Sequence, residues 1–115
     1  MSADEPIPRQ FPRIPAENTV LIQPLGPEDQ EALTKTRQIG LGGVLVSSVD
    51  SLGIDSYLRL IINLEHDDVE ATGRVVWEKA TEEGTFDIGV AFVSIDAAHR
   101  DRILALMPPP GEDSN

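Results

Sequence analysis

The sequence VEATGRVVW, residues 69–77, has small or apolar residues at its odd positions and mostly polar residues at its even positions. Successive side chains of a β-strand point to opposite faces, so this alternation indicates an antiparallel strand with one buried face. The segments 57–64 and 86–93 show the same period of two, with a large apolar residue at every even position. Three shorter runs predict earlier strands at about 19–23, 33–39 and 44–48, of which the run 33–39 is polar. A flat open sheet of six such strands would leave the apolar faces in water, so the pattern predicts a small closed barrel.

A single helix is expected after the last strand. Asp96 is a suitable N-cap, and the run 97–107 that follows ends before a proline. Four residues of this run recur at helical spacing on one stripe: His99, Ile103, Leu106 and Met107. The predicted fold class is therefore mainly β, an antiparallel barrel of six strands with a C-terminal α-helix that packs on it.

Length and composition bound the class of protein. A chain of 115 residues is long enough for one domain with one core. It contains no cysteine, which excludes disulfides and thiolate metal sites and fits a reducing compartment. It has no apolar run of about 18 residues, and its N-terminus lacks the features of a signal peptide. We therefore expect a cytoplasmic protein without membrane insertion.

The charge is strongly acidic and unevenly distributed. Twenty acidic residues against nine basic ones give a formal net charge of −11, which disfavours DNA or RNA as a partner because phosphates are repelled. Up to residue 37 there are four bases against six acids, and beyond it five against fourteen. A small anion would therefore bind in the N-terminal part.

The chain is expected to have three parts. Residues 1–16 carry Pro6, Pro8, Pro12 and Pro15, and each proline fixes φ and biases the preceding residue toward extended geometry, so an extended N-terminal arm is predicted. Residues 17–107 form the barrel and its helix. Residues 108–115 are rich in proline and acids, and we predict a disordered acidic tail.

The sequence contains no signature of an enzyme or a metal site. His66 and His99 lie far apart and outside any metal-binding spacing. The acidic turn 65–68 lacks the regular spacing of a calcium loop, and Ser47 and Ser48 have no recognisable partner for nucleophilic catalysis. We therefore predict a protein that is not an enzyme and has no catalytic residues, metal or cofactor.

Two arginines on the arm are the first candidates for binding. Arg9 and Arg13 lie four residues apart in a segment that Pro12 keeps out of a helix. A guanidinium fork bonds phosphate oxygens, or the O6 and N7 edge of guanine, in a bidentate manner. Two forks on one arm can close over a small dianion. The alternative interpretation is that they are solubilising charges on a loose terminus.

The glycine-rich bend QIGLGG, residues 38–43, is the second candidate. Its glycines permit positive φ and the close approach of another group, so a bend, a bulge or a ligand contact is expected here. Taken alone, the stretch favours the alternative interpretation, a tight hairpin turn without a ligand. A regular strand would place the side chain of the preceding Arg37 on the opposite face from Gln38.

The order of these features resembles the PilZ domain, a small bacterial module best known for binding cyclic di-GMP. Residues 9–13 resemble the RxxxR arm of that family, and residues 38–43 stand where its [D/N]xSxxG motif would stand. The segments 73–77 and 86–92 resemble its later strands, and a C-terminal helix follows. The resemblance covers about residues 9–107 and implies a six-stranded antiparallel barrel with a C-terminal helix.

By this resemblance, Arg9 and Arg13 would hold the phosphates and guanine edges of cyclic di-GMP, and the bend would present Gln38, Gly40 and Gly43 on the other side. Only Gly43 matches the second motif, because Gln38 stands in the place of Asp or Asn and Gly40 in the place of Ser. The resemblance implies a receptor whose ligand orders the arm and changes a surface offered to an unidentified protein partner. The alternative is a PilZ-like adaptor without nucleotide, acting through protein contacts in motility or surface-structure assembly.

Overall fold

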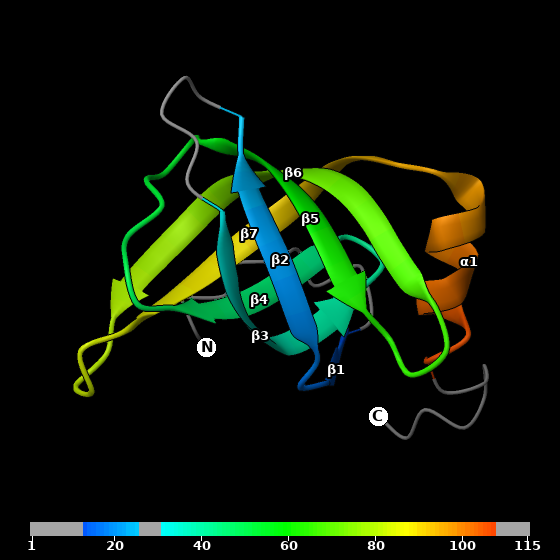
Figure 1. Cartoon of the computed structure of the whole chain (residues 1–115), viewed down its shortest axis with the longest axis horizontal. Coiled ribbons are helices and arrows are strands. Elements are labelled where there is room, and N and C mark those ends of the chain that lie inside the picture. Colours follow the sequence, from blue (N-terminus) through cyan, green and yellow to red (C-terminus); the bar gives the residue numbers. More distant parts are fainter. Residues whose placement is uncertain (1–12, 26–30, 108–115) are drawn as a thin grey trace.

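The computed structural model describes residues 13–25 and 31–107, which form seven strands and one helix (Figure 1). The elements are β1 (Arg13–Pro15), β2 (Thr19–Pro24), β3 (Ala32–Gly40), β4 (Gly43–Ser48), β5 (Tyr57–Asn63), β6 (Asp68–Ala80), β7 (Phe86–Ile95) and α1 (Ala97–Leu104). The predicted arm up to residue 12 and the predicted tail 108–115 lie outside the described residues.

The strands close into a barrel. Their antiparallel order is β3-β2-β5-β6-β7-β4, and β4 pairs again with β3 to complete the ring (Figure 1). The predicted antiparallel barrel of six strands with a C-terminal helix is thus confirmed. The β6–β7 hairpin is longer than the sequence pattern indicated, because its pairing continues out to Ala80 opposite Phe86. The short strand β1 pairs with β3 beyond the end of β2.

The core fills the inside of the ring. The period-two pattern predicted which side chains point inward on β5 and in the middle of β7. Its fully buried members in those strands are Leu58, Leu60, Ile62, Ile88 and Val90. Val20, Ile22, Val44 and Val46 complete the inner face from the other side. Where a strand is regular, inward and outward positions alternate, so its outward side chains do not contribute to the core.

Helix α1 ends at Leu104, earlier than the predicted 107, and Asp96 occupies the N-cap position without a side-chain capping bond. Ile103 is fully buried against the core and Met107 packs beside it. His99 was expected on the apolar stripe, but its Nδ1 accepts a hydrogen bond from the backbone N–H of Glu70, at 2.9 Å. This N–H lies just beyond the last β6–β7 pair, so the histidine ties the helix to the barrel where the strand ladder stops.

The bend between β3 and β4 is formed by residues 41 and 42. Among the described glycines, positive φ occurs at Gly53 and Gly84 and not in this bend. Close approach explains Gly43 instead, because a Cβ at this position would overlap the carbonyl oxygen of Val90 on β7. The glycine is therefore required by the tight pairing of β4 with β7 at this point.

Candidate functional site

Strand β1 brings the end of the predicted arm to the glycine bend. In the β1–β3 register, the backbone of Arg13 lies opposite Gly40, and Pro15 lies opposite Gln38. Three of the five predicted site residues, Arg13, Gln38 and Gly40, are thus neighbours in one short piece of sheet. Gly43 begins the next strand, and Arg9 lies outside the described residues.

Thr36 holds the junction between β1 and β2. Its side chain is 1% exposed, and its hydroxyl donates to the carbonyl oxygen of Ala16 at 2.6 Å. The same hydroxyl oxygen accepts the N–H of Asn18 at 3.0 Å. On either side, the N–H of Ala16 donates to the carbonyl of Arg37, and the N–H of Thr36 donates to the carbonyl of Asn18. One buried hydroxyl therefore fixes the loop from which β1 reaches the bend.

A β-bulge changes the direction of the side chains before the bend. In the β3–β4 register, Thr36 is opposite Val46 and Gln38 is opposite Leu45, so Arg37 is an extra residue without a partner. Val46 points into the core, and Leu45, the next residue along, therefore points outward together with Gln38. Arg37 is also exposed on the outer face. The expectation that Arg37 and Gln38 lie on opposite faces is wrong, because the bulge interrupts the alternation.

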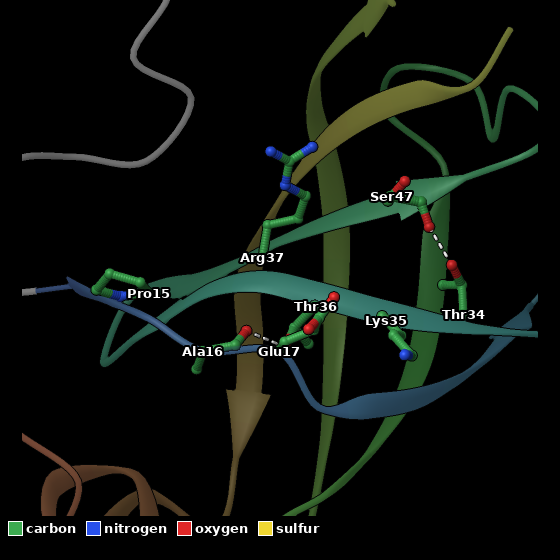
Figure 2. A pocket seen from close by; sticks show the side chains of 8 residues that line it. All are labelled: Pro15, Ala16, Glu17, Thr34, Lys35, Thr36, Arg37 and Ser47. Carbon is green, nitrogen blue, oxygen red and sulfur yellow. Dashed lines mark hydrogen bonds between the residues drawn. The ribbon is translucent and has the colours of Figure 1, made fainter. Parts of the chain in front are cut away.

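An open groove of about 620 Å³ lies beside this bulge (Figure 2). Its lining combines the β1–β2 junction, the middle of β3 and the end of β4: Pro15, Ala16, Glu17, Thr34, Lys35, Thr36, Arg37 and Ser47. Two of these residues, Lys35 and Arg37, are basic, and Glu17 is acidic. Within the described part of the chain, the ammonium of Lys35 has no ion pair. The groove therefore holds two basic side chains and one acidic one, and one of the two bases, Arg37, is paired with Asp87.

The sequence analysis did not identify Thr36 or the groove. A threonine between two bases in a strand is not a distinctive signal, since a hydroxyl is tolerated on either face. Elsewhere in the described ranges, no group of three or more His, Cys, Asp or Glu side chains is placed to hold a metal ion. Over the same ranges, no helix is long and apolar enough to cross a bilayer.

A closed antiparallel barrel whose N-terminal strand pairs beside the glycine bend is an architecture of the PilZ type. The PilZ domain family matches residues 8–107, and the chain belongs to this family. PilZ domains are binding modules, and the family takes cyclic di-GMP as a ligand. No match was found among curated proteins.

Solved structures share the fold. The inhibitor of motility MotI/DgrA of Bacillus subtilis is 25% identical with a TM-score of 0.74, over 86% of this chain and 49% of that one. The MrkH–c-di-GMP complex of K. pneumonia is 14% identical with a TM-score of 0.70, over 86% of this chain and 50% of that one. The PilZ domain with c-di-GMP of YcgR from Escherichia coli is 10% identical with a TM-score of 0.66, over 85% and 87%. The chain thus spans about half the length of the first two proteins.

Proposed function

We propose that this protein is a receptor for cyclic di-GMP that binds the nucleotide on the outer face of β1, β3 and β4. Arg9 and Arg13 hold its phosphates and guanine edges, and the bend contributes Gln38, Gly40 and Gly43. The observation that carries the proposal is the pairing of Arg13 with Gly40, which joins the two motifs in one sheet. The family match supports the choice of ligand.

Binding orders the arm and changes the surface that the barrel offers to a protein partner. The end of the arm, Arg13–Pro15, pairs with β3 as strand β1, so binding starts from an end that the barrel holds. This protein acts in the cytoplasm, without catalysis, as an adaptor for motility or a related process. The likeness to an inhibitor of motility supports that direction.

The second candidate is an adaptor that no longer binds the nucleotide. It is favoured by two departures from the family motif. Gln38 has a longer side chain than the Asp or Asn of the motif, and Gly40 lacks the hydroxyl of its Ser. If each change removes a hydrogen bond of about 1 to 1.5 kcal/mol, the affinity falls by roughly 30- to 150-fold. A receptor of high affinity tolerates this loss, whereas a weak one does not.

Calorimetry with cyclic di-GMP tests the receptor. We expect saturable heat with the unaltered protein and a large loss of affinity in Arg9→Ala and in Arg13→Ala. Arg59→Ala is the matched control, because Arg59 is an exposed arginine in a surface ion pair on β5. No heat at high micromolar nucleotide, or binding that ignores the two arm variants, would show that the receptor proposal is wrong.

The two candidates differ in their response to repair of the second motif. Gln38→Asp combined with Gly40→Ser restores the family pattern. If the protein is an adaptor without nucleotide, the double variant gains binding that the original lacks. An unchanged affinity in the double variant would count against this second candidate.

A further inference from the structure

We propose that Arg37 binds the phosphodiester of the nucleotide as a third guanidinium, beside the two of the arm. This inference rests on the proposed receptor function and assigns a residue outside both family motifs. The β-bulge makes it possible. A regular strand would direct Arg37 away from Gln38, whereas the extra residue puts both on the outer face, next to the groove.

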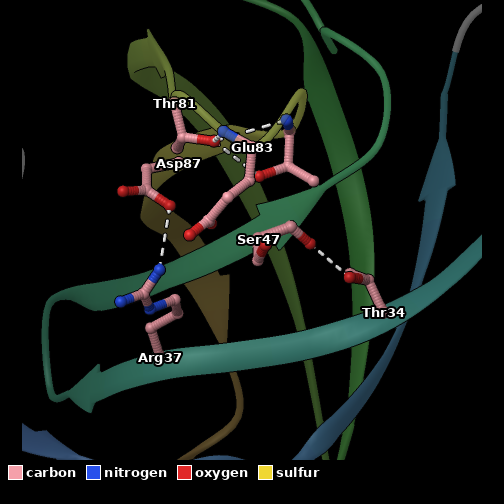
Figure 3. A network of polar contacts seen from close by, with 7 residues as sticks. Thr34, Arg37, Ser47, Thr81, Glu83 and Asp87 are labelled. Atoms are coloured by element: carbon pink, nitrogen blue, oxygen red, sulfur yellow. Dashed lines mark hydrogen bonds and ion pairs between the residues drawn. The ribbon is translucent and has the colours of Figure 1, made fainter.

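The ion pair between Arg37 and Asp87 can be exchanged for a pair with a phosphate. Its Nη1 lies 3.2 Å from Oδ1 of Asp87, and the Arg37 side chain is 55% exposed. Figure 3 shows Arg37 reaching from β3 over β4 to Asp87 on β7. A surface ion pair of this kind contributes little to stability, because solvent screens the two charges. A phosphate, which accepts the fork in a bidentate manner, can therefore replace the carboxylate.

The surroundings of Arg37 favour a dianion only on one side. Lys35 lies two residues away on the same outer face and adds a positive charge to the groove, whose one acidic lining residue is Glu17. Asp87 and Glu83 stand on the opposite side, at the β6–β7 hairpin (Figure 3). The phosphodiester is therefore expected over β3 and the end of β1, with Arg37 turning from Asp87 toward it. Along β3, Arg37 comes directly before Gln38, the partner of Pro15, and three residues before Gly40, the partner of Arg13.

The experiment is a titration of the full chain with cyclic di-GMP, comparing Arg37→Ala with Arg59→Ala. Both variants remove one exposed arginine and one surface ion pair, and Arg59 is 52% exposed, so they match in charge and setting. We expect Arg37→Ala to weaken binding about tenfold, since a charge-assisted hydrogen bond is lost. Arg59→Ala should stay within about twofold of the unaltered protein. Unchanged thermal unfolding of both variants shows that the barrel is intact.

Asp87→Asn adds a test of opposite sign. It releases Arg37 and removes a negative charge near the ligand, so binding should tighten by up to about fivefold. In the Arg37→Ala background this gain should shrink, because there is no guanidinium to release.

The outcomes separate this inference from the proposed function. Equal affinities of Arg37→Ala and Arg59→Ala, in a protein that still depends on Arg13, would overturn the role of Arg37 and leave the receptor standing. No binding to the unaltered protein would overturn both.

Discussion

The substitution Thr36→Val tests whether one buried hydroxyl controls the strand that carries the arm. Valine has nearly the shape of threonine, so the core keeps its packing, but the hydroxyl is lost. Two hydrogen bonds disappear with it, the donor bond to Ala16 at 2.6 Å and the acceptor bond from Asn18 at 3.0 Å. Ala16 and Asn18 are half-buried, so water replaces these bonds only in part. We expect a loss of about 2 kcal/mol in the free energy of unfolding.

Thr36→Ser is the matched control. It keeps the hydroxyl and removes one buried methyl group, at a cost of about 0.8 kcal/mol. The unfolding free energies come from denaturant titrations followed by the fluorescence of Trp77, the one tryptophan of the chain. Valine should lower the stability more than serine does. If serine is as damaging as valine, packing of the methyl group and not the hydrogen bonds stabilises this junction.

The same variants report on the arm through hydrogen exchange. The amide of Ala16 donates to the carbonyl of Arg37 at 3.1 Å, so it exchanges when β1 separates from β3. Thr36→Val should speed exchange at Ala16 well beyond any change at the amides of β5. Cyclic di-GMP affinity should fall in proportion to the fraction of molecules in which β1 remains paired. If the Thr36→Val variant keeps the hydrogen-exchange rate of Ala16 and the affinity for cyclic di-GMP unchanged, the link between Thr36 and the site is refuted.

Two further predictions concern the frame around the site. Gly43→Ala should destabilise the barrel severely, because the new Cβ would overlap the carbonyl oxygen of Val90. Gly84→Ala is the control. It should cost only about 1 to 2 kcal/mol, for the positive φ of this residue, because nothing lies near the new Cβ. Thermal unfolding of the pair distinguishes them, and equal losses would contradict the steric argument. Glu78→Ala should lower the free energy of unfolding by about 2 to 3 kcal/mol in denaturant titrations, because the Glu78 carboxylate accepts three hydrogen bonds from residues 51–53. A loss no larger than that of an ordinary surface substitution would contradict this role.

The barrel could be predicted from the sequence because its strands keep one buried face over most of their length. The prediction lost accuracy in β3. Leu33 and Ile39 are six residues apart, which a regular strand places on one face, yet Leu33 is 70% exposed and Ile39 is fully buried. The bulge at Arg37 shifts the alternation by one residue between them. A bulge depends on how the neighbouring strand pairs, so a single strand's pattern does not reveal it.

The sequence named candidate residues for the site but not how they are arranged. The arginine spacing and the glycines pointed to a ligand, and the structure brings Arg13 to Gly40. The strand β1 itself was not predicted, since three residues with a proline carry no periodic signal. Pro15 fits there because β1 pairs only with β3 among the described strands, so the missing N–H faces no second partner.

The groove exists because both edges of β3 are irregular at the same point. On the edge toward β1 and β2, residues 16–18 stand opposite only Thr36 and Arg37, since the register runs from Pro15 opposite Gln38 to Thr19 opposite Lys35. On the edge toward β4, Arg37 is the extra residue. Continuous ladders would close this surface, whereas interrupted ones bend the strand and leave room beside it. The residues that open the groove are therefore also those that line it. A substitution or deletion that restores continuous ladders along β3 should remove the groove and leave the barrel intact.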